Sequence, residues 1–387
     1  MPSRVRHDRP GITMINPRID AFDLVHCPVT AKTTWSFIRL RMSDNVTGWG
    51  EATWVRDPAA LDASHAAIRR HLVGREWPVL AGFLARNTAG VPQSAIASAL
   101  EQAMWDIRGK RGGCAAAALA DKHYRRQVPL YANINRSIID RSATGFRLAA
   151  QKAVAAGFTR IKIAPFDGVT PENAPTPAGR LLIEAGLVRV AATRAAIGPA
   201  TELYVDCHWR FDPRTAAAVM KEVAALGVVW FECPLPETAA NIPALKRLRA
   251  NANALGMRLA GLEELTGPAD FIPWLAAGAY DVVMPDVKYA RGIAGVLAVA
   301  ELAASYGVGC APHNPSGPIA HAASLTACAI GGAIEQLEHQ FDETPLFWHM
   351  IDAHFPRPAH GASLLPSLPG LGTPLLIGDA MAPQTPL

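Results

Sequence analysis

The sequence predicts an α/β protein in which an α+β N-terminal unit precedes a (β/α)8-type barrel. Two observations support this fold class. From residue 128 onward, eight apolar strand-like runs alternate with helical runs, and such alternation indicates parallel strands joined by right-handed crossover helices. Before residue 128, strand-like runs neighbour one another and precede the helical segments. An open doubly wound sheet is the alternative, although it favours a glycine-rich loop after its first strand and residues 133–136 contain no glycine.

The first unit, residues 1–127, is predicted to combine a β-hairpin with two helices. Residues 34–52 alternate apolar and polar side chains on both sides of a turn signal at Asp44, which is typical of two antiparallel strands. Apolar residues then recur at helical spacing over residues 59–84 and again over residues 93–120.

The second unit, residues 128–344, is the predicted barrel domain. Its strands are expected at residues 128–135, 159–166, 202–209, 228–234, 258–263, 281–286, 307–313 and 334–339. Helical segments between them include residues 143–156, 180–197, 214–226 and 293–306. Residues 345–387 form a C-terminal segment rich in proline and glycine, and its spaced leucines predict that it packs back on the N-terminal unit.

Composition narrows the class of protein. A chain of 387 residues that is 50% hydrophobic can bury a large core. The net charge of +4 comes without a run of Lys or Arg, which argues against a nucleic-acid partner. The longest apolar stretch, residues 292–312, contains Glu301, and the first ten residues are polar, so neither a membrane span nor a signal peptide is expected. Six cysteines without a C-x-x-C pair indicate a reducing, cytoplasmic compartment.

Three acidic residues follow three consecutive predicted strands. Asp206, Glu232 and Glu263 each end an apolar run, and the carboxyl ends of barrel strands meet at one rim. Because three uncompensated carboxylates repel one another and are costly to bury, we expect them to bind a hard divalent cation. The alternative is that each acid pairs with a separate arginine. Strand alternation would put His208 on the same face as Asp206.

Other titratable side chains are expected at the same rim. Lys162 lies between two isoleucines of the second barrel strand, and its ammonium would face the metal site if the side chain points inward. Asp286 and His313 end the sixth and seventh strands, where the carboxylate would orient the imidazole and make it more basic. Alternation does not fix the direction of Glu338 in the eighth strand.

An ordered series of motifs runs through nearly the whole chain. It consists of Trp49-Gly50-Glu51-Ala52, Ala103-Met104-Trp105-Asp106, Gly157-Phe158-Thr159, Asp206, Trp230-Phe231-Glu232, Glu263, Pro285-Asp286, Pro312-His313 and Leu368-Pro369-Gly370-Leu371-Gly372. This series resembles the enolase superfamily, in its mandelate racemase and muconate lactonizing enzyme branch. The resemblance implies an N-terminal capping domain completed by the C-terminal segment, Mg²⁺ on the three acids, and abstraction of a proton α to a carboxylate.

Departures from the branch pattern narrow the expected reaction. Members often carry Lys-x-Lys on the second strand with the second lysine as the base, whereas here Lys162 is followed by Ala164 at that position. The Asp-x-His pair with a following Arg210 resembles the galactonate and mannonate types of acid-sugar dehydratase, as do residues 312–318. We therefore expect a Mg²⁺-dependent dehydratase that eliminates the β-hydroxyl of an acid sugar and forms a 2-keto-3-deoxy acid.

The resemblance implies a role for each catalytic candidate. His313, oriented by Asp286, would remove the α-proton, and His208 would protonate the departing hydroxyl. Lys162 would support the substrate carboxylate, and Glu338 would hydrogen-bond the enediolate. Substrate selection is expected in two N-terminal loops over the barrel mouth and in nearby basic residues. The candidate substrate-binding residues are His26, Lys32, Trp54, Arg56, Arg210 and Lys288.

The expected partner is a small-molecule carboxylate, a sugar acid, and the chain is expected to form a homo-oligomer. Two other functions stay open. A racemase or epimerase of a hydroxy acid needs bases on both faces of the α-carbon, which Lys162 and His313 could supply if Lys162 reaches the gap left at Ala164. A non-catalytic barrel that only binds an acid is the second alternative.

Overall fold

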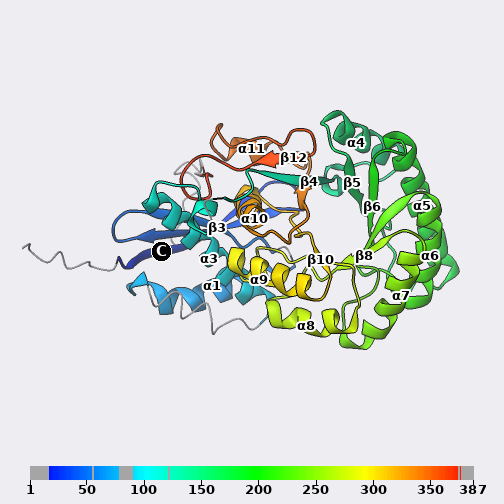
Figure 1. The fold of residues 1–387 in the computed structure, drawn as a ribbon, viewed down its shortest axis with the longest axis horizontal. Coiled ribbons are helices and arrows are strands. Elements are labelled where there is room, and N and C mark those ends of the chain that lie inside the picture. Colours follow the sequence, from blue (N-terminus) through cyan, green and yellow to red (C-terminus); the bar gives the residue numbers. More distant parts are fainter. Residues whose placement is uncertain (1–16, 55, 78–89, 121–122, 374, 376–387) are drawn as a thin grey trace, which may run out of the picture.

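The computed structural model describes residues 17–54, 56–77, 90–120, 123–373 and 375. In Figure 1, a small three-stranded sheet with helices α1 and α3 lies beside a ring of strands whose outer side is covered by helices. The predicted fold class, a barrel with an α+β capping domain, is confirmed. Within the described residues, no helix is long and apolar enough to cross a membrane.

The capping domain is an antiparallel sheet covered by two helices. Its strands are β1 (Ile19–Pro28), β2 (Thr34–Met42) and β3 (Thr47–Glu51), with β2 in the centre. The helices are α1 (Pro58–Leu72) and α3 (Val91–Gly112). Apolar side chains from the sheet and both helices form one core. The hairpin prediction is confirmed.

Both predicted N-terminal helices are shorter than expected. Helix α1 ends at Leu72, and Gly74 then takes a positive φ of 80°; residues 78–84 of the predicted helix lie outside the described residues in this part of the chain. Helix α3 ends at Gly112 because Gly113 adopts the left-handed conformation with a φ of 60°, which glycine accepts without steric cost.

The barrel strands are parallel and follow the chain around the ring. They are β4 (Gln127–Asn133), β5 (Arg160–Ile163), β6 (Glu202–Asp206), β7 (Val228–Glu232), β8 (Arg258–Gly261), β9 (Val282–Val283), β10 (Gly309–Cys310) and β11 (Leu337–Gln340). Strand β11 pairs with β4, and a parallel bridge between Cys310 and Ile334 joins β10 to the segment before β11. This bridge closes the ring.

Seven helices of the described chain follow the barrel strands and cover the outer face. They are α4 (Ala143–Ala155), α5 (Pro177–Ile197), α6 (Pro213–Ala225), α7 (Ile242–Ala254), α8 (Pro268–Ala277), α9 (Gly292–Ser305) and α10 (Pro318–Ile330). After β11, the one helix in the described part of the chain is the short α11 (Leu346–His349), in a segment that Pro345, Pro356 and Pro358 interrupt.

The C-terminal segment connects the barrel to the cap. Strand β12 (Ala362–Leu364) pairs antiparallel with β4, so the segment first lies on the barrel. It then reaches the capping domain, where the backbone N–H of Leu371 donates to Asp106 Oδ1 (3.0 Å) and the N–H of Ala116 donates to the carbonyl of Gly370 (2.7 Å). The expected packing on the N-terminal unit is confirmed, and the pairing with β4 is an addition to it.

Carboxylates of the cap also meet the N-termini of two barrel helices. Glu101 accepts from the backbone N–H groups of Ile293 (2.8 Å) and Ala294 (3.1 Å) at the start of α9. Glu51 accepts from Gly317 (2.8 Å) and Ala320 (2.9 Å) at the start of α10. The first N–H groups of a helix have no partner within it and carry partial positive charge, so these contacts fix the cap over the barrel mouth.

Strands β6 to β8 end in residues with an unusual backbone. His208 and Trp209 after β6, Cys233 after β7 and Leu262 after β8 have φ values of 48°, 58°, 44° and 72°. Such left-handed residues without glycine are strained and concentrate at functional sites. They also end the strands early: the predicted strand 202–209 stops at Asp206, so a turn rather than strand alternation sets the direction of His208.

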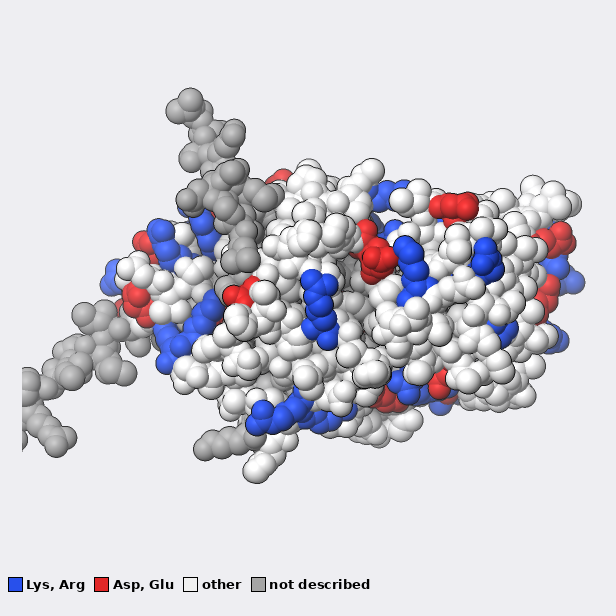
Figure 2. Space-filling view, turned by 90° about the horizontal axis from the view of Figure 1, so that it is seen from above, with Lys and Arg blue, Asp and Glu red and all other residues white. Residues whose placement is uncertain are grey.

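The interior of the ring is closed below the rim by apolar and aromatic side chains. Tyr131, Tyr204 and Trp230 are buried there, and the rings of Tyr204 and Trp230 stack with centroids 4.9 Å apart. The described interior of the barrel is therefore a packed core, as is usual for this architecture. On the outer face shown in Figure 2, basic side chains are dispersed and alternate with acidic ones.

Candidate active site

A cavity of about 290 Å³ lies between the barrel rim and the cap. Its lining consists of Thr53, Trp54 and Arg56 from the cap and Asn133, Asn135, Arg136, Asp206, His208, Trp209, Glu263, Glu264, Lys288, Tyr289, His313 and Pro315 from the barrel. A larger cavity of about 370 Å³ lies among aromatic side chains outside β11, and none of the predicted site residues line it.

The three predicted metal ligands are buried at the rim on neighbouring strands. Asp206 and Glu232 are register partners at the ends of β6 and β7, and Glu263 follows β8. Burial and the negative charges of its two neighbours raise the pKa of Glu263 well above its usual range. Burial also raises the pKa of Glu232, which feels the charge of Asp206. The three carboxylates thus destabilise one another's charged forms.

Basic side chains compensate two of these acids. Asp206 Oδ2 lies 2.7 Å from His208 Nε2. Burial alone would raise the pKa of Asp206, but the charge and hydrogen bond of His208 lower it to about 2. Glu232 Oε1 accepts from Lys162 Nζ at 2.5 Å, and its Oε2 accepts from the indole N–H of Trp230 at 2.8 Å.

The predicted metal site depends on how the carboxylates of Asp206, Glu232 and Glu263 are arranged. Within the described residues, no three His, Cys, Asp or Glu side chains are grouped as metal ligands. The donor chemistry nevertheless fits a hard cation, because Asp206, Glu232 and Glu263 are buried oxygen donors that lack enough positive charge.

Lys162 points into the barrel, which is the condition on which its expected role depends. Its Nζ lies between Glu232 and Glu338, 2.9 Å from Glu338 Oε1. Burial by itself would lower the pKa of Lys162, but the two carboxylates raise it well above its ordinary value. Lys162 is therefore a fixed positive charge in this arrangement and a poor base.

Glu338 also points inward, which strand alternation could not decide. Its Oε1 accepts from Asn133 Nδ2 (2.6 Å) as well as from Lys162, and its Oε2 accepts from the backbone N–H of Asn314 (2.9 Å). Glu338 is fully buried and does not line the cavity. Both oxygens of Glu338 already accept from Lys162, Asn133 or Asn314, and the predicted hydrogen bond to the enediolate stays a prediction.

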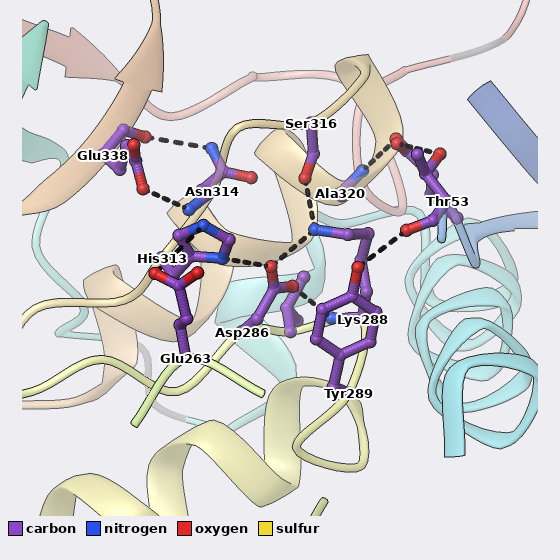
Figure 3. Close-up of polar contacts among 12 residues, drawn as sticks. Thr53, Glu263, Asp286, Lys288, Tyr289, His313, Asn314, Ser316, Ala320 and Glu338 are labelled. Carbon is purple, nitrogen blue, oxygen red and sulfur yellow. Dashed lines mark hydrogen bonds and ion pairs between the residues drawn. The ribbon is translucent and has the colours of Figure 1, made fainter. Parts of the chain in front are cut away.

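His313 and Asp286 form the predicted pair (Figure 3). His313 Nδ1 lies 2.8 Å from Asp286 Oδ2, and His313 Nε2 lies 3.5 Å from Glu263 Oε2. Burial would raise the pKa of Asp286, but Lys288 and His313 together lower it. An ionised Asp286 can only accept, so it fixes the proton of His313 on Nδ1 and leaves Nε2 toward the cavity.

Lys288 lines the cavity, but its ammonium is occupied. It contacts Asp286 Oδ2 at 2.5 Å and also the hydroxyl of Ser316, and Lys288 is only 2% exposed. Figure 3 shows the Lys288 ammonium between Ser316 and Asp286, whose carboxylate also contacts His313. The arrangement makes Lys288 a support for Asp286 more than a ligand for substrate.

Two of the four cap candidates reach the cavity. Trp54 and Arg56 line it, and Arg56 forms an ion pair with Glu264 at 2.7 Å and lies over the ring of Trp209. Arg56 is therefore held by a carboxylate and an aromatic face from the barrel rim, so it joins the cap to the site.

The structure does not bring the remaining candidates to the cavity. His26 lies on β1, where its Nδ1 is 2.8 Å from Ser36 Oγ and its Nε2 is 3.0 Å from Asp62 Oδ1. Lys32 is exposed in the turn between β1 and β2. The guanidinium of Arg210 donates to the carbonyl of Phe166 instead of pointing into the site.

Sequence reasoning missed several polar lining residues, among them Asn135 and Arg136. They follow β4 directly, in the short 3₁₀ turn of residues 135–137. Position after a barrel strand is the signal that identified Asp206 and His313, and it could have identified these two residues as well.

The chain matches two protein-family models. Residues 16–120 match the mandelate racemase / muconate lactonizing enzyme N-terminal domain, and residues 145–376 match the enolase C-terminal domain-like family. The second match alone covers more than half of the chain.

Relatives and solved structures agree with these matches. The chain is 32% identical over 313 residues to the D-galactonate dehydratase of Verminephrobacter eiseniae, covering 75% of this chain and 74% of that protein. It is 30% identical over 308 residues to the D-galactonate dehydratase of Xanthomonas euvesicatoria, covering 76% and 75%. A mandelate racemase/muconate lactonizing enzyme-like protein of Roseovarius sp. superposes with a TM-score of 0.80 at 25% identity, covering 92% of this chain and 93% of that one. A mandelate racemase/muconate lactonizing enzyme of Jannaschia sp. superposes with a TM-score of 0.81 at 25% identity, covering 94% and 96%.

Proposed function

Since the chain belongs to the mandelate racemase and muconate lactonizing enzyme branch of the enolase superfamily, we propose that it is a Mg²⁺-dependent acid-sugar dehydratase. The enzyme is a hydro-lyase, related to D-galactonate dehydratases over three quarters of its length. The proposed reaction removes the proton α to a carboxylate, eliminates the β-hydroxyl as water and yields a 2-keto-3-deoxy acid.

The observation that carries the proposal is a pair of imidazoles that line one cavity. His313 is held by Asp286 at 2.8 Å, and His208 is held by Asp206 at 2.7 Å. Elimination of water needs one group that accepts a proton from carbon and another that donates a proton to oxygen. Two imidazoles, one beside Asp206 and the other beside Asp286 and Glu263, meet this need.

His313 is the proposed base for the first step. Its Nε2 accepts the α-proton, and Asp286 then stabilises the imidazolium through the hydrogen bond at Nδ1. Lys288, bonded to the same carboxylate oxygen of Asp286, keeps that carboxyl group ionised and fixes its orientation.

Negative charge moves onto the substrate carboxylate as the proton leaves. When bound to Asp206, Glu232 and Glu263, Mg²⁺ would supply the charge that stabilises this enediolate. The ammonium of Lys162 contributes a second positive charge from within the barrel, held in position by Glu232 and Glu338.

His208 is the proposed acid for the second step. It donates a proton to the β-oxygen as the carbon–oxygen bond breaks, so the proton and the hydroxyl group leave together as water. Its side chain is 36% exposed, which allows the imidazole to recover a proton from solvent. The enol product then takes up a proton at carbon to become the 2-keto acid.

Two alternatives from the sequence have less support. Epimerisation needs a second base, and the candidate Lys162 is held as a cation by two carboxylates. A purely acid-binding barrel would not need two oriented imidazoles in one cavity.

A screen of acid sugars for 2-keto acid formation tests the proposal. The purified enzyme with Mg²⁺ should convert one or more sugar acids to a product detected by a carbonyl reagent, and excess chelator should abolish the reaction. Full activity in chelator would exclude the metal role. Exchange of the α-proton with solvent without loss of water would indicate epimerisation.

A further inference from the structure

The end of strand β3 in the cap contacts both barrel loops that carry the proposed base and its carboxylate partner. The loop after β9 is bound through Tyr289, whose hydroxyl donates to the carbonyl of Thr53 at 3.0 Å (Figure 3). The loop after β10 is bound through Gly317, whose backbone N–H donates to Glu51 Oε1 at 2.8 Å. The hydroxyl of Thr53 donates to the same oxygen of Glu51 at 2.7 Å, so both contacts share one anchor in the cap.

Glu51 is buried in the interface between the cap and the barrel. Its second carboxylate oxygen accepts from the backbone N–H of Ala320 at 2.9 Å. A Cβ atom at Gly317 would lie 2.9 and 3.0 Å from the two carboxylate oxygens, so a side chain at this position would displace Glu51. Burial raises the pKa of Glu51, whereas the N–H of Ala320 and the charge of Lys288 oppose this rise. The carboxylate and the start of α10 therefore hold each other in place, with the Lys288 ammonium nearby.

Lys288 joins this segment to the base. Its ammonium contacts the hydroxyl of Ser316, the residue before Gly317, and lies 2.5 Å from Asp286 Oδ2. An ammonium group can only donate, so both oxygens accept from it. Lys288 and Ser316 are almost fully buried, and solvent does not compete for these contacts. Asp286 Oδ2 is also the oxygen that lies 2.8 Å from His313 Nδ1 (Figure 3).

Each of these contacts orients the next group, and the last group is the imidazole that takes the α-proton. A displacement of about 1 Å at a reacting group can lower a rate about 100-fold. Within the dehydratase function proposed above, on which this inference rests, we infer that Glu51 of the cap is a positioning residue for the base His313. It acts through Ser316 and Lys288, which fix the carboxylate of Asp286.

Replacement of Glu51 tests this role against a matched contact elsewhere in the interface. The control is Glu101→Ala, because Glu101 is a cap carboxylate that accepts from two backbone N–H groups at the start of α9. With Mg²⁺ and an acid sugar that the wild type dehydrates, Glu51→Ala should lower kcat about 10- to 100-fold and change KM less than about threefold. Glu101→Ala should lower Tm to a similar extent in calorimetry but change kcat less than about threefold. Glu51→Gln keeps one acceptor oxygen and should recover part of kcat.

Ser316→Ala tests the middle of the path without altering the cap. It removes the hydroxyl that accepts from Lys288 and leaves the contact between Gly317 and Glu51 in place, so it also serves if Glu51→Ala fails to fold. Its kcat should fall about 3- to 30-fold. The double variant with Glu51→Ala should lose less than the product of the two single losses, because both changes act through Lys288. The control Ser324→Ala removes a buried hydroxyl of α10 that lacks a hydrogen-bond partner within the described chain, and it should leave kcat unchanged.

The proton on Nδ1 of His313 gives a measurement that does not depend on turnover. A hydrogen bond to a carboxylate moves an imidazole N–H proton downfield in the NMR spectrum, and the signal that disappears in His313→Asn identifies this proton. Its chemical shift should change in Glu51→Ala and Ser316→Ala and stay the same in Glu101→Ala and Ser324→Ala.

The outcomes separate this inference from the proposed function. Three results would each overturn the positioning role while dehydration by the wild type still stands: equal kcat losses in Glu51→Ala and Glu101→Ala, multiplicative losses for Glu51→Ala and Ser316→Ala, or an unchanged His313 signal in both. Absence of dehydration with every acid sugar would overturn the proposed function, and the NMR comparison would then still decide whether Glu51 orients His313.

Discussion

His208 and His313 are two residues of the site whose positions could be predicted from the sequence. Each imidazole was identified from its place after a strand, and each lies against the carboxylate expected from the sequence. Their assigned roles differ, since His313 takes the proton from carbon and His208 gives a proton to the leaving oxygen.

The two histidine variants should therefore fail differently in D₂O. His313→Asn should lose both α-proton exchange and dehydration, by about 10²- to 10⁴-fold, because the base is gone. His208→Asn should lose dehydration to a similar extent while retaining exchange at the α-carbon. Mass spectrometry of the recovered substrate and product measures both. Exchange that survives in His313→Asn but vanishes in His208→Asn would reverse the assignment.

A second pair of histidines should make folding stability depend on pH. His321 and His339 are buried with ring centroids 5.0 Å apart. Burial lowers the pKa of His339 to about 4 and that of His321 well below its usual 6.5. Between pH 6.5 and about 4 the unfolded chain binds protons that the native chain does not, so these residues stabilise the fold above pH 6.5 and lose that contribution as pH falls.

Replacement of His339 by Gln should remove part of this pH dependence. The slope of the unfolding free energy between pH 4.5 and 6 should fall by about 1.4 kcal/mol per pH unit, the value for one proton. Urea unfolding at several pH values measures the slope. His71→Gln, at an exposed position in the last turn of α1, serves as control; equal slopes in wild type and His339→Gln would contradict the assignment.

Elements were predicted more reliably than their ends. The hairpin, the barrel strands and the covering helices follow from apolar periodicity, but β6, β7 and β8 stop earlier than expected. Turn prediction relies on glycine and proline, whereas these strands end in His208, Cys233 and Leu262 with positive φ. Tertiary contacts at the rim impose that backbone, and a single sequence carries no local signal for it.

The contact between Glu101 on α3 and the N-terminus of α9 can be tested as a link between the cap and the barrel. Glu101 on α3 accepts from Ile293 and Ala294 at the start of α9 and from the indole N–H of Trp105 at 2.6 Å. Glu101→Ala should lower the unfolding free energy by about 1–3 kcal/mol, since buried donors lose their acceptor. Calorimetry should give a smaller loss for Glu101→Gln, which keeps one oxygen, and almost no loss for the exposed Glu301→Ala on α9. Equal stability of Glu101→Ala and wild type would contradict this role.

For the molecule as a whole, the metal should act as a stabilising ligand. The three rim acids are buried with too little positive charge, so a cation that binds only the folded protein relieves their repulsion. Mg²⁺ at 100 times its Kd should stabilise the wild type by about 2.7 kcal/mol. Thermal unfolding with and without Mg²⁺ measures this gain, which Asp206→Asn and Glu263→Gln should largely abolish; the same gain in both variants would exclude the site.

The architecture and the rim acids could be predicted from sequence because an apolar run that ends in an acidic residue marks the carboxyl end of a barrel strand. The cap contacts could not, because they depend on how a separate domain sits over the barrel. Trp54 and Arg56 reach the cavity, whereas His26 and Lys32 from the same domain do not. All four were expected in loops over the barrel mouth, whereas His26 lies within strand β1 and Lys32 lies in the exposed turn after it.

The return of the C-terminal segment to α3 has a consequence for the order of folding. The backbone N–H of Leu371 donates a hydrogen bond to Asp106, 265 residues earlier, and β12 pairs antiparallel with β4, the first barrel strand. Contacts so distant in sequence are slow to form, and synthesis from the N-terminus delivers the cap long before residues 362–371. During synthesis, the capping domain therefore lacks its contact with the C-terminal segment until residues 362–371 have been made. The nascent chain is exposed to chaperones and proteases until the barrel is complete.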